Sequence, residues 1–192
     1  KINEFKDYLG VSDQDFIIGS FARMETFSTP FLDFVIKVLH QESKVKILLA
    51  GPNDNTLVKN KLQQFIEVKR AFILPTVDVN IVGHCIDIGL DTFPLHSGYS
   101  VLELMGKKIP VLSKKDKFLG SLISDRLPEA VKSDENDLLQ LITNFVLDPR
   151  LLHTFKNKTG EFMKLYNRGD SFVEIIGETI NVIKNKKFVQ KI

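Results

Sequence analysis

The stretch that decides the fold is DIGLDTFPLHSGYSVLELMGKKIPVLS, residues 87–113. It begins within a short apolar strand, which we predict over 86–90 and which ends at Asp91. A loop of proline and small residues follows, a helix is predicted to begin near Ser100, and a second apolar strand follows Pro110. This order aims backbone N–H groups and the positive end of a helix at one point, where an anion can sit.

Strands and helices alternate upstream of this stretch. The run FIIGSF, residues 16–21, is too apolar to have a solvated face, as expected for a central strand of a parallel sheet. Ser28 or Thr29, followed by Pro30, is a good start for a helix. Further elements are expected as strands at 44–50 and 71–74, helices at 31–41 and 55–67, and a short helix or turn at 78–84.

Both long helices carry an apolar stripe that should pack on the sheet. The predicted inward residues are Phe31, Phe34, Val35, Val38 and Leu39 in one helix, and Leu57, Leu62, Phe65 and Ile66 in the other. Alternation with short connections predicts right-handed βαβ units, and therefore an α/β, Rossmann-like, doubly wound parallel sheet of about six strands.

The chain becomes mainly helical after Lys117. One more short strand is predicted at Ala130 and Val131, and helices at 134–147, 150–166 and 171–187. We therefore divide the chain into a polar lead-in or linker at 1–14, a Rossmann-like domain at 15–170 and a C-terminal helix at 171–192.

Composition sets broad limits on function. The chain has 192 residues, of which 43% are apolar, so it can bury roughly 70% of its unfolded surface without disulfides. A net charge of +2 gives no general reason to expect nucleic acid as a partner. Cys85 is the single cysteine, so no disulfide framework is possible and a reducing, cytoplasmic compartment is permitted. We predict that Cys85 is a buried small hydrophobe. Because the chain begins with Lys1, we expect a piece of a longer protein.

Three loops should meet beyond the carboxyl ends of the strands, where ligands bind in open parallel sheets. They span 20–28, 74–79 and 91–100, and they carry Arg23 and Glu25 in the first loop and His96 in the third. No second histidine or cysteine is spaced to form a metal site with His96, so we predict no bound metal.

The helix near Ser100 has the pattern of a nucleotide site. Gly98 lets the main chain approach a ligand, Ser100 can cap the helix or donate to a phosphate, and Glu103 can accept from two ribose hydroxyls. The alternatives are a plain tight turn for the glycine loop, a first-turn acid that favours the helix dipole for Glu103, and a polar loop residue for His96.

The segment LDTFPLHSGYSVLELMGKKIPVLS resembles the donor-binding motif of GT-B glycosyltransferases, through Pro94, Gly98, Glu103, Gly106 and Pro110-Val111. Together with FIIGSFARMETFSTPFLDFVIKVL, VKILLAG and DIGLDTFP, it is similar to protein O-linked N-acetylglucosamine transferases and related bacterial cytosolic transferases. This resemblance covers roughly residues 15–180 and implies one half of a GT-B fold, with a UDP-sugar as donor substrate and no further cofactor.

The resemblance also implies the site residues. Uracil would lie against Leu74 and Pro75, the diphosphate over Gly98, Tyr99 and Ser100, and the ribose on Glu103. A family lysine in the first loop is matched by Thr26, so Arg23 is the predicted catalytic residue that stabilises the leaving group; a family histidine is matched by Tyr99. The full predicted set is Ser20, Arg23, Leu74, Pro75, His96, Ser97, Gly98, Tyr99, Ser100 and Glu103.

The implied function is donor binding in an enzyme that moves a sugar to a protein or glycan acceptor. The base and the acceptor site would belong to a missing N-terminal Rossmann domain, so we expect the chain alone to be inactive. The alternatives are a non-catalytic interaction or regulatory module and an epimerase of the same fold. The basic segment at 184–191 is interpreted as the end of a helix that crosses to the other domain, as a solvated tail, or as a contact with an anionic membrane surface.

Overall fold

The computed structural model describes residues 2–12, 14–115 and 127–167 of the chain. Its centre is a six-stranded sheet in which every neighbouring pair of strands is parallel. The strands follow the order β3-β2-β1-β4-β5-β6. Their bounds are β1 Phe16–Phe21, β2 Val45–Ala50, β3 Ala71–Leu74, β4 Ile88–Leu90, β5 Val111–Lys114 and β6 Val131–Lys132.

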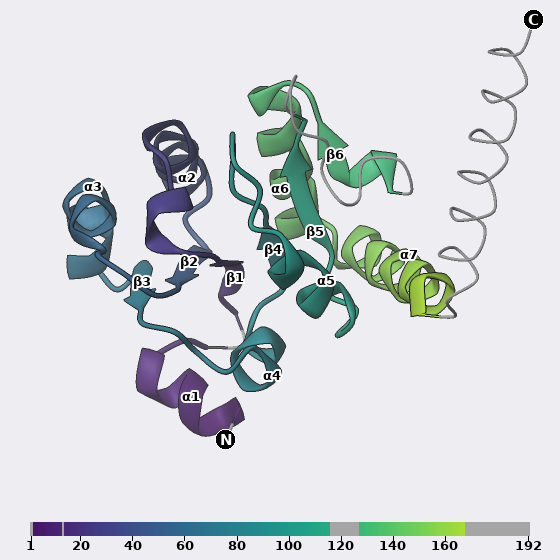
Figure 1. Cartoon of the computed structure of the whole chain (residues 1–192), viewed down its shortest axis with the longest axis horizontal. Coiled ribbons are helices and arrows are strands. Elements are labelled where there is room, and N and C mark those ends of the chain that lie inside the picture. Colours follow the sequence, from purple (N-terminus) through teal and green to yellow (C-terminus); the bar gives the residue numbers. More distant parts are fainter. Residues whose placement is uncertain (1, 13, 116–126, 168–192) are drawn as a thin grey trace, which may run out of the picture.

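Helices cover both faces of the sheet (Figure 1). The helices α2, α3 and α6 lie on one side, and α1, α4 and α5 lie on the other. Their bounds are α1 Ile2–Leu9, α2 Thr29–Gln41, α3 Thr56–Glu67, α4 Val79–Val82, α5 Tyr99–Met105, α6 Glu135–Leu147 and α7 Pro149–Asn167, with short 3-10 turns η1 Met24–Thr26, η2 Gly83–Cys85 and η3 Pro128–Ala130. This arrangement confirms the predicted Rossmann-like α/β class.

The first βαβ unit follows the sequence pattern closely. Ser28 caps α2, because its Oγ accepts from the Phe31 amide at 3.3 Å and donates to the Phe93 carbonyl at 2.6 Å. All five residues of the predicted α2 stripe are fully buried. The capping residue therefore fixes both the start of α2 and the position of the loop after β4.

Three details differ from the sequence-based predictions. The lead-in contains a helix, α1, for which no helix was predicted, and its Leu9 is buried. In α3 Leu62 and Phe65 are buried as predicted, but at the start of the helix Val58 is buried in place of Leu57, which is 49% exposed. Strand β4 begins at Ile88 rather than at residue 86.

The other C-terminal predictions divide between the described and undescribed parts. Strand β6 begins at Val131, one residue later than predicted, and helices α6 and α7 match the predicted pair, separated at Asp148. The predicted helix at 171–187 and the basic segment at 184–191 lie outside the described residues.

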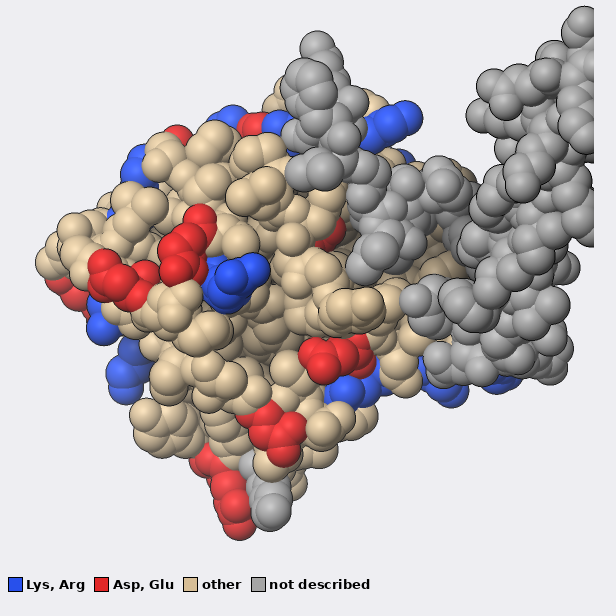
Figure 2. All heavy atoms as spheres, in the orientation of Figure 1, with Lys and Arg blue, Asp and Glu red and all other residues tan. Residues whose placement is uncertain are grey.

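The surface carries charges of both signs. On the face in Figure 2, acidic and basic side chains are interspersed over the described part, with no broad patch of one sign. Within the residues described, no helix is long and apolar enough to cross a membrane. Cys85 is buried as predicted, and burial raises the pKa of its thiol.

Candidate functional site

The strand order reverses direction between β1 and β4, which is where Rossmann-like sheets bind ligands. A cavity of about 230 Å³ opens beside this point, beyond the carboxyl ends of the strands. It is lined by Phe21, Ala22, Arg23, Ala50, Gly51, Pro52, Thr76, Val77, Val79, Ser97 and Ser100. All three predicted loops therefore meet at one cavity, and the loop after β2 joins them.

The floor of the cavity is built from closely packed backbone. A Cβ placed on Gly51 would lie 1.6 Å from the Ala22 carbonyl oxygen, so only glycine fits there. The Met24 amide donates to the Pro52 carbonyl at 3.1 Å, and Asn53 Nδ2 donates to Glu25 Oε1 at 2.6 Å. The loops after β1 and β2 thus form one unit, of which only the loop after β1 was predicted to belong to the site.

Asp91 organises the loop after β4. Its side chain is 1% exposed, and its Oδ1 accepts from the Ser97 amide at 2.8 Å and from the Ser97 hydroxyl at 2.6 Å. Its Oδ2 lies 2.6 Å from His96 Nδ1 and accepts from the Ser113 hydroxyl at 3.1 Å. Sequence reasoning treated Asp91 only as the end of a strand, because no local pattern reveals partners from β5 and from the loop.

Ser100 continues this network toward β1. Its Oγ donates to the Phe21 carbonyl at 2.6 Å and lies 3.2 Å from the Ser97 carbonyl. A hydroxyl has one hydrogen to donate. That hydrogen, predicted to be donated to a phosphate, is directed at the Phe21 carbonyl instead, and the Ser97 hydroxyl is directed at Asp91. The alternative prediction, that Ser100 caps the helix, is wrong, because the residue at the cap position is Gly98. Both serines line the cavity while their hydroxyl hydrogens hold its wall together.

Gly98 and Tyr99 form the outer part of this loop. Gly98 has φ +70° and ψ −129°, a conformation that favours glycine, and a Cβ there would meet nothing within 4 Å. Tyr99 is 81% exposed, so its ring is free to reach a ligand. Glu103 is exposed one turn further along α5, on the protein surface and not in the core.

The remaining predicted residues occupy different depths. Arg23 is exposed and lines the cavity, whereas His96 is nearly covered and lies against Asp91. Leu74 is half-buried and Pro75 is exposed, directly before Thr76 of the cavity wall. Ser20 is 2% exposed, and its hydroxyl has no hydrogen-bond partner among the described residues, so it lies beneath the cavity surface.

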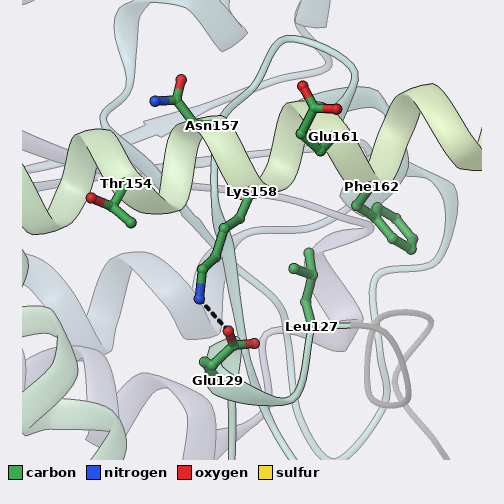
Figure 3. Close-up of a pocket in the computed structure, with 7 residues that line it drawn as sticks. All are labelled: Leu127, Glu129, Thr154, Asn157, Lys158, Glu161 and Phe162. Atoms are coloured by element: carbon green, nitrogen blue, oxygen red, sulfur yellow. Dashed lines mark hydrogen bonds and ion pairs between the residues drawn. The ribbon is translucent and has the colours of Figure 1, made fainter.

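A second, larger cavity of about 660 Å³ lies between α7 and the segment before β6 (Figure 3). Leu127 and Phe162 give it apolar walls, and Lys158 bridges to Glu129 across it. None of its lining residues belongs to the predicted site. Within the described residues, no group of three or more His, Cys, Asp or Glu side chains is placed to hold a metal ion.

The amino end of β4 carries a second aspartate, Asp87. Its Oδ2 accepts from the Ile17 amide at 2.8 Å, which fastens the start of β1 beside β4. Burial raises the pKa of the Asp87 carboxyl, and the hydrogen bond from Ile17 opposes that rise only in part.

Comparison with solved structures finds proteins that share this fold. A mutant of the O-GlcNAc transferase of Thermobaculum terrenum superposes with a TM-score of 0.73 at 18% identity, over 88% of this chain and 36% of that one. HepE of Anabaena, in complex with UDP, gives 0.71 at 15% identity, over 92% and 52%. The chain has the fold of one half of a GT-B glycosyltransferase.

This GT-B half-domain is also similar to the sucrose-phosphate synthase of Thermosynechococcus elongatus, with a TM-score of 0.69 at 14% identity, over 94% of this chain and 48% of that one. The chain thus spans between about a third and a half of the length of these proteins. No protein-family model matches the sequence, and no curated protein matches it. The resemblance inferred from the 87–113 stretch is confirmed at the level of the fold.

Proposed function

We propose that this chain is the donor-binding domain of a glycosyltransferase and that it binds a nucleoside diphosphate sugar, with UDP as the favoured nucleotide. The observation that carries the proposal is the cavity at the carboxyl edge of the sheet, lined by Arg23, Ser97 and Ser100. Support comes from the fold neighbours, since HepE of Anabaena has structures with UDP and with UDP and glucose.

The proposed roles follow from charge and position. Arg23 is the cation of the cavity wall that would stabilise the departing diphosphate. The first amides of α5, at Tyr99 and Ser100, have no carbonyl partner within the helix and can donate to phosphate oxygens. Glu103, exposed one turn along α5, would accept from the ribose, and uracil would lie at Leu74 and Pro75. No metal or further cofactor enters this scheme.

The rest of the reaction would need a second domain. In the proposal, a second Rossmann domain on the N-terminal side supplies the base and the site for a protein or glycan acceptor, and this chain alone transfers no sugar. The UDP affinity of the isolated chain would then be about millimolar, equivalent to about −4 kcal/mol. In the same proposal the whole enzyme is cytoplasmic and makes a peripheral contact with the inner face of the membrane.

A second candidate is a non-catalytic interaction or regulatory module. Thr26, at the position that the family resemblance assigns to a lysine, carries no charge, and its hydroxyl donates to the Arg23 carbonyl at 2.7 Å. Tyr99 likewise brings no charge to the loop. In this alternative the cavity persists as part of the fold and takes no nucleotide.

An NMR titration of the 192-residue chain with UDP, UDP-sugars and GDP tests the proposal. We expect amide shifts in the loop at 97–100 that saturate in the millimolar range with UDP and less readily with GDP. Arg23→Gln should weaken UDP binding about tenfold, because a charge-assisted contact is lost. Arg150→Gln, which removes an exposed arginine of α7, is the matched control and should leave binding unchanged. Equal indifference to UDP and GDP would favour the non-catalytic module.

A further inference from the structure

Polar contacts connect β5 to β1 along the wall of the cavity. Ser113 of β5 donates to Asp91, Ser97 donates to Asp91 twice, and Ser100 lies against the Ser97 carbonyl and donates to Phe21 at the end of β1. The network spans the point at which the strand order reverses. Its only described carboxylate is that of Asp91, which is also its most heavily bonded member.

A buried carboxylate is costly unless several donors satisfy it. Asp91 meets this condition, since each oxygen has two partners: Ser97 supplies both donors to Oδ1, and His96 and Ser113 face Oδ2. Two of these three residues, His96 and Ser97, belong to the loop that leads into α5. The carboxylate therefore holds the loop in place from beneath, without itself lining the cavity.

We propose that Asp91 is a positioning residue for nucleotide binding: by accepting from the Ser97 amide and hydroxyl, it sets the geometry of the backbone that meets the diphosphate. This inference rests on the proposed donor-binding function. It assigns Asp91 no contact with the ligand. Its effect is transmitted through Ser97, and through Ser97 to Ser100 and Gly98.

Asp87 provides an internal control for a purely structural effect. Asp87 directly precedes β4, whereas Asp91 directly follows that strand. The Asp87 carboxylate accepts from the Ile17 amide at the amino ends of the strands, opposite the cavity. A substitution at Asp87 perturbs the same strand but does not touch the loop at 96–100. A change in nucleotide affinity that follows Asp91 and not Asp87 therefore reports loop geometry and not general stability.

The experiment measures UDP affinity by NMR titration, amide hydrogen exchange and unfolding by urea for the wild-type chain, Asp91→Ala, Asp91→Asn and Asp87→Asn. We expect Asp91→Ala to lose at least tenfold in UDP affinity and to lose exchange protection at the Ser97 amide. Asp91→Asn retains one oxygen for the Ser97 amide, so it should recover part of both. Asp87→Asn should change UDP affinity less than twofold.

Each outcome decides a separate question. Wild-type UDP affinity and Ser97 protection in a folded Asp91→Ala would overturn the inference while the donor-binding function stands. If Asp91→Ala fails to fold, the test uses Asp91→Asn and Ser97→Ala instead. Wild-type UDP affinity and wild-type exchange protection of the residue-97 amide in both variants would overturn the inference. Absence of UDP binding by the wild-type chain would instead refute the proposed function, and the inference with it.

Discussion

The two ends of strand β4 place the same residue type in two different roles. At the amino end, Asp87 accepts one described backbone hydrogen bond, from Ile17, and its pKa is raised because burial outweighs that bond. At the carboxyl end, Asp91 has four partners from three residues and lies deeper. The comparison indicates that one hydrogen bond to the Asp87 carboxylate holds β1 beside β4, whereas holding the loop after β4 takes several hydrogen bonds to Asp91.

The largest effect is expected at Gly51, which lies at the carboxyl ends of the strands. In Gly51→Ala the new Cβ would overlap the Ala22 carbonyl oxygen. Because relieving this overlap requires the backbone to move, we expect a loss of about 3 kcal/mol in the free energy of unfolding. Urea unfolding measures it. Gly10→Ala, near the amino edge with open space around its Cβ and φ +63°, is the control and should cost about 1 kcal/mol. Equal costs would contradict the close packing of the cavity floor.

A smaller effect is expected at Gly98. Gly98→Ala meets no neighbouring atom but forces an alanine into φ +70°, so we expect a loss of about 1 to 2 kcal/mol in stability. The measurement pairs urea unfolding with a UDP titration. UDP affinity should fall in Gly98→Ala and stay constant in Gly10→Ala, since only Gly98 belongs to the loop of the cavity. Retention of full affinity would argue against backbone contacts at 98–100.

Ser28 tests how firmly the loop after β4 is tied to α2. Ser28→Ala removes both the cap on Phe31 and the hydrogen bond to the Phe93 carbonyl, and it should cost about 1 kcal/mol. Thermal unfolding gives the value. Ser12→Ala, which removes an exposed hydroxyl near the amino edge that donates to Asp15, should cost less than about 0.5 kcal/mol. A reversed order would show that the carboxyl edge is the looser one.

The smallest effect concerns Asp87 and depends on pH. Because its pKa is higher in the folded chain than its ordinary value of 3.8, the folded state binds more protons between those two values, and wild-type stability falls as the pH rises through that window. Asp87→Asn keeps an acceptor for Ile17 without the charge. We therefore expect it to be at least as stable as wild type at pH 7, with the difference shrinking below pH 3.8. Urea unfolding across pH 3 to 7 measures this; a variant less stable than wild type at pH 7 would contradict it.

Most of the fold could be predicted because its signals are local. The apolar run at 16–21 and the α2 stripe have periods that match a buried strand and an amphipathic helix. Ser28 with Pro30 marks the start of α2 within one residue. Helix α1 has a weaker signal, since Leu9 is its one buried residue and the helix packs on the short turns around Cys85.

The site could be predicted only as a place, because its internal bonding joins distant segments. The convergence of three loops followed from parallel strands, and Arg23, Ser97 and Ser100 were correctly expected to share that edge. The role of Gly51 depends on Ala22, which is distant in the chain. Asp91 has one distant partner, Ser113, and two nearby ones, His96 and Ser97, whose contacts with it no sequence pattern indicates. The roles of all site residues in binding stay predictions until a ligand is titrated.

Phe93 anchors the loop that follows β4. Its ring packs edge-on against Phe31 and Phe34, the Lys114 ammonium lies 4.8 Å above its face, and its carbonyl accepts from Ser28. Together with the bonds at Ser97, this leaves Pro94 and Leu95 as the exposed residues between two anchored points. The described part of this loop is therefore held in place without a ligand, and binding of a nucleotide as proposed should carry little entropic penalty from ordering the loop.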